Sequence, residues 1–168
     1  TVTAEDDGIE LYFEKDSMSL YTQIYRSENE ADELKLLDST QELSWFDESV
    51  NTTQEYHYAI RELDECGNLT DFSQIHNNVV LKLNNEDNRF FDFTFNEYKG
   101  WQEKTPLIYI KNSVYYEFAA NNSPMTLDLK DYILGHGGMF RIKVTRDSLF
   151  SLSNIAYPVI YPKIWIPD

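Results

Sequence analysis

The sequence is short of cysteine, of basic residues and of long apolar runs, and each shortage excludes a class of protein. Cys66 is the single cysteine, so no internal disulfide forms and the chain depends on apolar cores. The 14 Lys and Arg face 29 Asp and Glu, for a formal charge of −15, and they form no basic cluster. This balance argues against nucleic acid as a partner and against anionic membrane surfaces. No run approaches the roughly 18 apolar residues of a membrane-spanning helix, and no secretory signal pattern is visible in this chain.

Aromatic residues are abundant instead. The chain of 168 residues contains 12 Tyr and 10 Phe, and only six Gly and five Pro, which excludes a low-complexity linker protein. Alternation of apolar and polar residues predicts short strands separated by turn signals, and no amphipathic helix of useful length. The length suits two small domains, so the fold class predicted is all-β, with two β-sandwiches in tandem. The expected strands cover residues 9–13, 20–26, 34–37, 44–47, 56–63, 72–83, 91–95, two segments within 107–118, 125–129, 140–144 and 155–161.

A polar interruption divides these strands into two groups. Residues 84–88 read Asn-Asn-Glu-Asp-Asn, with several turn formers and no apolar side chain. We interpret them as a short linker between a module of residues 1–83 and a second module of residues 89–168. Because proline is confined to edge strands, Pro158 indicates that the last strand lies at a sheet edge.

The first module resembles a fibronectin type III domain, especially the microbial versions. Residues 21–27, Tyr-Thr-Gln-Ile-Tyr-Arg-Ser, are similar to the third strand of that family. Residues 56–68 resemble its sixth strand and the turn after it, and Ser73 matches the serine that usually opens its last strand. Phe13 stands where the family usually has a buried Trp. The resemblance implies an immunoglobulin-like β-sandwich.

The second module resembles the same family more loosely. Residues 127–129 and 140–144 look like the fifth and sixth strands, and residues 153–155 look like the opening of the last strand. Phe140 replaces the Tyr expected there, so the hydrogen bond of a tyrosine corner is not expected. A diverged immunoglobulin-like sandwich or a jelly roll is the alternative for this half. The resemblance implies an internal repeat, in which Phe72-Ser73-Gln74-Ile75 corresponds to Leu152-Ser153-Asn154-Ile155.

No motif of a catalytic or cofactor site is present, so we predict neither an enzyme nor a cofactor. The chain lacks the Gly-x-Ser-x-Gly nucleophile elbow, and His57, His76 and His136 have no metal-ligand spacing. His57 occupies an outward strand position, for which surface exposure is expected. Cys66 is interpreted as a buried packing residue, with a reactive thiol as the alternative.

Two acidic pairs are weak candidates for a Ca²⁺ site. They are Asp6 with Asp7, and Glu86 with Asp87, whose oxygen atoms are the hard ligands that Ca²⁺ prefers. Neither pair has the spacing of an EF-hand, and a solvated surface explains the same residues. We therefore predict no metal, with these four residues as the positions to inspect.

Exposed aromatic rings are the other candidates for binding. Trp101 lies in an expected loop, and Tyr115 and Tyr116 place one ring on each face of a strand. A flat exposed ring stacks on sugars, but aromatic residues mostly supply buried area. The alternative for Trp101 is packing at the end of a sandwich or in the interface between the modules.

Two functional hypotheses follow. The first is a non-catalytic structural or adhesive module pair of a phage virion or a microbial surface assembly, acting as a spacer or docking surface for other protein subunits or modules. The second is a carbohydrate-binding accessory region of a secreted polysaccharide-degrading enzyme, with polysaccharide as the partner. Both place the chain in a virion or outside the cell, and neither involves nucleic acid or membrane insertion.

Overall fold

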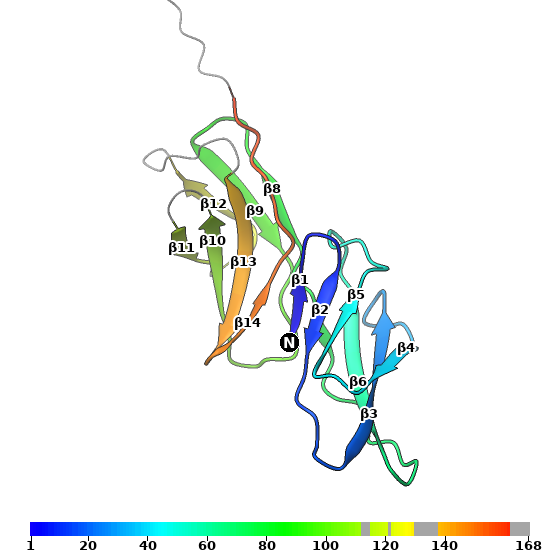
Figure 1. Cartoon of the computed structure of the whole chain (residues 1–168). Coiled ribbons are helices and arrows are strands. Elements are labelled where there is room, and N and C mark those ends of the chain that lie inside the picture. The colour runs from blue at the N-terminus through cyan, green and yellow to red at the C-terminus, as the bar shows by residue number, and fades with distance from the viewer. Residues whose placement is uncertain (112–114, 121, 130–137, 162–168) are drawn as a thin grey trace, which may run out of the picture.

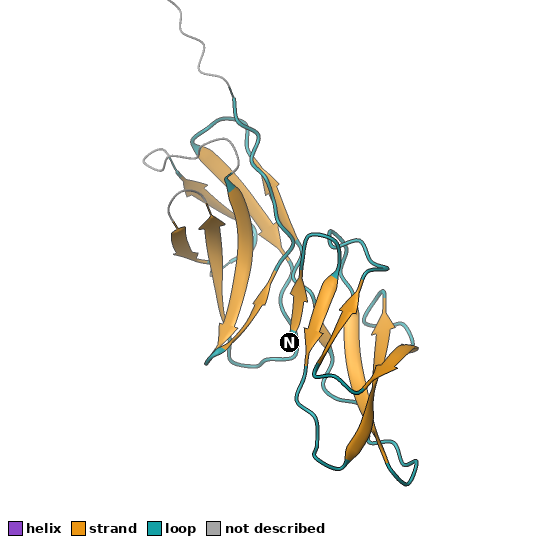
Figure 2. Ribbon diagram, viewed as in Figure 1, coloured by secondary structure: helices purple, strands orange, loops and turns teal. Residues whose placement is uncertain are grey.

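The chain folds into two β-sandwich modules that lie end to end (Figures 1 and 2). The computed structural model describes residues 1–111, 115–120, 122–129 and 138–161. Within these ranges the regular elements are fourteen strands, with antiparallel pairing throughout and no helix. The all-β prediction is confirmed. The part of the chain that the structure describes contains no apolar helix of membrane-spanning length.

The first module packs a three-stranded sheet against a four-stranded one. The smaller sheet has the order β1-β2-β5 and the larger has the order β4-β3-β6-β7. Their bounds are β1 (Val2–Ala4), β2 (Ile9–Tyr12), β3 (Ser19–Ser27), β4 (Lys35–Thr40), β5 (Ser44–Asp47), β6 (His57–Asp64) and β7 (His76–Asn77).

The second module repeats this topology strand for strand. Its smaller sheet has the order β12-β9-β8 and its larger sheet has the order β11-β10-β13-β14, so its seven strands pair as the seven strands of the first module do. The jelly-roll alternative for this half is thereby excluded. The bounds are β8 (Leu81–Asn84), β9 (Phe90–Phe95), β10 (Thr105–Lys111), β11 (Tyr115–Ala119), β12 (Met125–Asp128), β13 (Met139–Arg146) and β14 (Leu149–Leu152).

Alternation along the strands builds both interiors. In β9, Phe91 and Phe93 are fully buried while their neighbours point outward, as a period of two residues requires. Phe140 of β13 lies against both rings, with centroids 5.7 and 5.4 Å away. The buried residues of the two modules form one continuous apolar cluster, with Phe13 packed at its margin.

A matched pair of serines confirms the internal repeat predicted from the sequence. In the first module, Ile60 N donates to Ser73 Oγ at 3.0 Å and Ser73 N donates to Ile60 O at 2.8 Å. In the second, Ile142 N donates to Ser153 Oγ and Ser153 N donates to Ile142 O, both at 2.8 Å. Each serine thus completes the backbone hydrogen bonds of the sixth strand of its own module.

The structure moves the boundary between the modules. Residues 81–83, expected to end the first module, lie in β8, which pairs with β9 in the second. The expected linker, residues 84–88, therefore lies at the end of β8 and in the turn to β9, and the passage between modules is residues 78–80, which we call the connector. The expectation failed because the turn within a hairpin and a linker between domains have the same polar composition.

The chain after β14 also differs from the prediction of a final strand over residues 155–161. Within this segment, only Ala156 forms a β-bridge, to Phe140. Asn side chains hold the rest: Asn85 exchanges hydrogen bonds of 2.7 and 3.1 Å with the backbone of Val159, and Asn88 exchanges bonds of 2.6 and 2.8 Å with Tyr161. Side-chain amides here replace the backbone partners of a sheet.

Candidate functional site: the module junction

Side chains of the second module bind the backbone of β1, which lies beside β14 (Figure 1). Ser151 Oγ donates to Val2 O, and Arg141 Nη2 donates to Ala4 O. Val2 N donates in turn to the hydroxyl of Tyr98 at 3.3 Å. All of these groups are buried, where a lost partner leaves a backbone group unsatisfied at a cost of about 1–3 kcal/mol. The junction therefore has a polar seam that fixes the position of β1.

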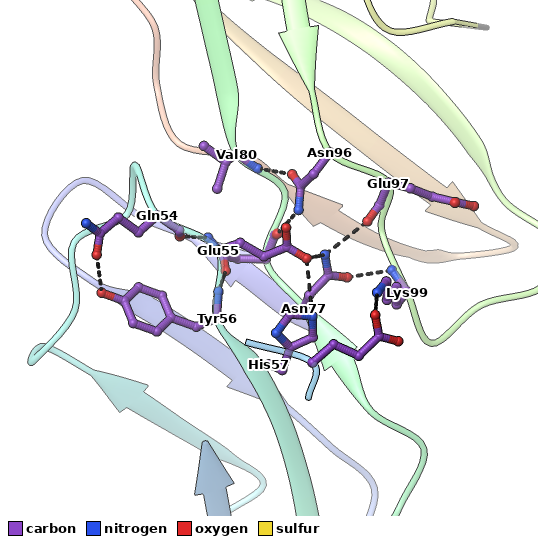
Figure 3. A network of polar contacts seen from close by, with 11 residues as sticks. Gln54, Glu55, Tyr56, His57, Asn77, Val80, Asn96, Glu97 and Lys99 are labelled. Atoms are coloured by element: carbon purple, nitrogen blue, oxygen red, sulfur yellow. Dashed lines mark hydrogen bonds and ion pairs between the residues drawn. The ribbon is translucent and has the colours of Figure 1, made fainter. Parts of the chain in front are cut away.

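Two asparagines, the buried Asn78 and the partly buried Asn96, bond the connector to both modules (Figure 3). Asn78 accepts from Tyr56 N at 2.7 Å and donates to Gln54 O at 2.9 Å, which ties the connector to the first module. Asn96 accepts from Val80 N at 2.6 Å and donates to Asn78 O at 3.1 Å, which ties it to the second. The connector is thus bonded from both sides.

Asn77 extends this network to charged groups (Figure 3). Its amide nitrogen donates to Glu97 O at 3.0 Å and to Glu55 Oε1 at 2.8 Å, and its oxygen accepts from Lys99 N at 2.5 Å. Lys99 also forms an ion pair with Glu30 of the first module. Hydrogen bonding to Lys99 lowers the pKa of the Glu30 carboxyl, and this salt link is exposed and so contributes little.

A cluster of three rings fills the space beside β1. Tyr98 and Trp101 of the second module lie 4.8 Å apart between centroids, and both meet the ring of His76 at the end of the first module. The hydroxyl of Tyr98 lies 2.9 Å from His76 Nδ1. That hydroxyl also accepts from Val2 N, so it links the imidazole to the backbone of β1.

Burial keeps His76 neutral, since desolvation disfavours the charged imidazole. It lowers the pKa of His76 to about 4, with smaller effects of the positive charges of the N-terminus and Arg146. Burial also raises the pKa of the Tyr98 hydroxyl. Gly100 packs directly on the imidazole with φ of 98°, so any Cβ there would collide with the His76 ring.

The aromatic candidates for sugar binding have separate outcomes. Trp101 borders a groove of about 630 Å³ between the modules, but its side chain is only 5% exposed. A ring so enclosed has no free face for stacking, and its place is the module interface that was the alternative. The side chains of Tyr115 and Tyr116 lie outside the part of the chain that the structure describes.

The acidic candidates occupy two separate turns. Asp6 and Asp7 lie between β1 and β2, whereas Glu86 and Asp87 lie between β8 and β9. Asp87 Oδ1 accepts the N–H groups of Arg89, just before β9, and of Phe90, its first residue, both at 2.7 Å. These backbone hydrogen bonds lower the pKa of Asp87. Among the described residues, no group of three or more metal-ligating side chains gathers at either turn.

Two predictions about single residues were wrong. Cys66 is exposed rather than buried, because it sits in a tight turn where Asp64 Oδ1 accepts its N–H and that of Asn68, both at 2.8 Å. His57 is 4% exposed rather than on the surface, because it opens β6 beside the junction (Figure 3). Its Nε2 lies 3.2 Å from Glu55 Oε1 without hydrogen-bond alignment. His136 lies outside the described residues.

Sequence reasoning missed the residues that form the junction. Arg141 reads as an ordinary outward residue of an alternating strand, and Asn77, Asn78 and Asn96 read as turn formers. A run of Asn beside strand ends was the only signal, and it did not reveal which backbone the amides would meet.

Comparisons with known proteins find similarity to solved structures. No protein family profile matches the chain, and no curated protein matches it. The chain is similar to the FN1–FN3 domains of chicken CNTN1, with a TM-score of 0.34 and 8% identity over 93% of this chain. It covers 62% of that structure, which is less than two thirds of its length.

The order of the strands in the sheets identifies the fold. Each module has seven antiparallel strands in a three-stranded and a four-stranded sheet, and the order is the same in both. A serine completes the sixth strand of each module in the same way. The chain is therefore a tandem pair of β-sandwiches, each with the seven-stranded, two-sheet architecture that immunoglobulin and fibronectin type III domains share.

Proposed function

We propose that the chain is a non-catalytic structural module pair that acts as a rigid spacer in a protein assembly. The observation that carries this proposal is the immobilised junction, where the connector and β1 are bonded from both modules. Domains joined by small polar interfaces move relative to one another by default. Here the apolar cluster continues across the interface, and side-chain amides bond the connector to both modules, which opposes such motion.

The context proposed is a phage virion or a microbial surface assembly, with other protein subunits or modules as partners. A rigid pair is useful there because it holds two surfaces at a set distance and angle. The strong acidity supports this role, since net charge keeps a protein soluble and limits unspecific association. The carbohydrate-binding alternative loses support because Trp101 is enclosed at the interface.

Distances between spin labels test the rigidity. Cys66 is the single cysteine and is exposed in the first module, and Glu86→Cys adds a second exposed site in the second module. Electron–electron double resonance on this labelled pair should give one narrow distance distribution. A broad or bimodal distribution in the otherwise unaltered chain would sink the proposal.

Variants of the junction sharpen this test. Asn78→Ala with Asn96→Ala removes the bonds of the connector to both modules, and we expect the distribution to broaden. Asn51→Ala is the matched control, because Asn51 lies in a turn of the first module and also bonds through its side chain, to Thr53. The control should keep the narrow distribution.

A further inference from the structure

All of the net charge lies in one module. Residues 1–80 contain 19 Asp and Glu against 4 Lys and Arg, whereas residues 81–168 contain ten of each. The first module thus carries the whole formal charge of −15, and the second carries none. Spread over one small domain, this charge makes a strong negative potential around its surface.

An apolar patch lies on that acidic module, on the outer face of the sheet β4-β3-β6-β7. The inner face of β3 holds Thr22 and Ile24, both fully buried, so the residues that alternate with them point away from the core. The members of this outer-face patch are Tyr21, Tyr25, Leu36, Leu63, Leu69 and Phe72.

Strand register places these side chains together. Tyr25 lies opposite Leu36 of β4, and Tyr21 lies opposite Leu63 of β6. Leu63 in turn forms a β-bridge with Leu69. Residues directly opposite one another in antiparallel strands project to the same side of the sheet, so all five share the outer face.

Phe72 completes the patch. Its ring meets Tyr25 edge-on at 4.9 Å, and the guanidinium of Arg61 lies 4.9 Å from its centroid. Arg61 Nε donates to Thr70 O at 2.7 Å, so its cation is held over the ring.

The patch is open to solvent at its most apolar positions. The exposed fraction is 54% for Leu36, 44% for Phe72, 39% for Leu69 and 37% for Tyr21. Exposed apolar side chains that gather on one face and are rimmed by polar groups are typical of protein interaction sites.

Carboxylates dominate the rim of this face. The strands and turns that bound it carry five exposed acidic residues, while Lys35 and Arg61 are their basic neighbours, and Arg61 is already bonded. An apolar centre within an acidic rim is complementary to an apolar centre within a basic rim. The acidic residues are Asp32, Glu33, Asp38, Glu65 and Asp71.

The corresponding face of the second module makes a contact with a neighbouring module. Arg141 alternates with the core residues Phe140 and Ile142 and therefore points outward from β13, yet it is only 9% exposed. The first module covers it: Arg141 donates to Ala4 O and lies 3.8 Å from Glu5. One outward residue of this sheet is thus covered by the neighbouring module, while the outer-face patch of the first module has no such cover among the described residues.

We propose that the outer-face patch docks a separate protein whose contact surface has apolar side chains surrounded by Lys and Arg. This inference rests on the proposed role in a protein assembly and names the chemistry of the partner. A second copy of the chain does not fit, because its first module is strongly acidic and its second module has no net positive charge to match the acidic rim. Charge steers the approach of a basic partner, and the apolar centre then holds it.

Two matched peptides probe the surface by fluorescence anisotropy. One alternates Leu and Lys over 12 residues, and the other alternates Ser and Lys with the same charge. At low salt we expect the Leu-Lys peptide to bind the unaltered chain about tenfold more tightly, the gain typical of one well-buried contact. Both affinities should fall at high salt, because exposed charges are screened.

The double variant Leu36→Ser, Phe72→Ser should remove the preference for the Leu-Lys peptide. Its control is Leu149→Ser, Phe150→Ser, because these two side chains of the second module are 49% and 50% exposed; the control should keep the preference. The single variant Leu36→Ser, at an exposed edge position, should lose part of the preference and guards against misfolding of the double variant.

Four results would overturn the docking proposal. They are equal affinity for the two peptides, the same loss in the control, binding of a Leu-Glu peptide as tight as that of Leu-Lys, and a dimer of the unaltered chain that the double variant abolishes. The failure of the docking proposal and that of the spacer proposal are distinguishable. Spin-label distances on the double variant report the junction alone, and they should stay narrow whichever peptide result is obtained.

Discussion

The two modules have the same strand order, but the interior of the first contains a buried carboxylate, whereas that of the second contains a cluster of phenylalanine rings. In the first, Asp47 is buried and accepts from Arg26 Nη1 at 2.5 Å and from the Tyr58 hydroxyl at 3.0 Å. In the second, Phe140 takes the strand position of Tyr58 and packs on Phe91 and Phe93. The surfaces differ as well, because the first module carries all of the net charge and the second carries none.

This comparison teaches that the topology depends on alternation and on a few backbone contacts, not on the chemistry of the interior. Both modules keep the serine that bonds the sixth strand. A buried charge pair is weak evidence of stability, since its desolvation offsets its attraction. An aromatic interior supports the same fold without that cost.

The largest effect is expected at the buried charge of the first module. Asp47→Ala leaves Arg26 and the Tyr58 hydroxyl without this partner and should lower the free energy of unfolding by about 3–5 kcal/mol. Asp128→Ala is the control at the matching end of β12, where the ion pair with Arg89 is exposed, and should cost no more than about 1 kcal/mol. Urea denaturation measures both, and equal losses would mean that burial does not distinguish the two sites.

A pH dependence is expected from His76, which ends the first module, whereas β14 ends the second without a histidine. The pKa of His76 is about 4 in the folded chain and about 6.5 when unfolded. Stability due to neutral His76 is therefore fully present above pH 6.5 and is lost as the pH falls to 4, by up to about 3 kcal/mol. The variant His76→Asn should show a correspondingly shallower loss in denaturation curves between pH 7 and 4. Parallel curves for the two proteins would refute this assignment.

The paired serines should differ in their contribution to the free energy of unfolding, because their burial differs. Ser153 is fully buried, so Ser153→Ala leaves Ile142 N unsatisfied and should cost about 1–3 kcal/mol. Ser73 is exposed, so water replaces its hydroxyl in Ser73→Ala and the loss should stay below about 1 kcal/mol. Thermal unfolding of the two variants tests this order, and the reverse order would contradict it.

Effects of a size similar to those of the serine substitutions are expected from exchanging the ring at the matched strand position. Tyr58→Phe removes one donor from Asp47 while Arg26 remains, and should cost about 0.5–1.5 kcal/mol. Phe140→Tyr adds a hydroxyl to an aromatic interior and should cost about 1–3 kcal/mol through overpacking. Near-UV circular dichroism with chemical denaturation follows both changes. A stabilising Phe140→Tyr would show that the second interior accepts a polar group after all.

Prediction from sequence succeeded where the signal was local and failed where it was not. The strand positions around Phe91 and Ile142 followed from alternation, and the correspondence of Ser73 with Ser153 followed from the repeat. The boundary at residues 84–88 failed, because a polar run has the same composition in a hairpin turn as in a linker.

The sequence by itself determined an all-β chain of two modules, because the alternation of apolar and polar side chains along a strand is a pattern of neighbouring residues. Only the tertiary structure decided how the modules join. Arg141 and Asn78 have side chains that bond any backbone within reach, and which backbone lies there depends on the whole fold. The tandem arrangement was thus readable from local pattern, whereas the junction and the exposed face of the acidic module arose from contacts between distant segments.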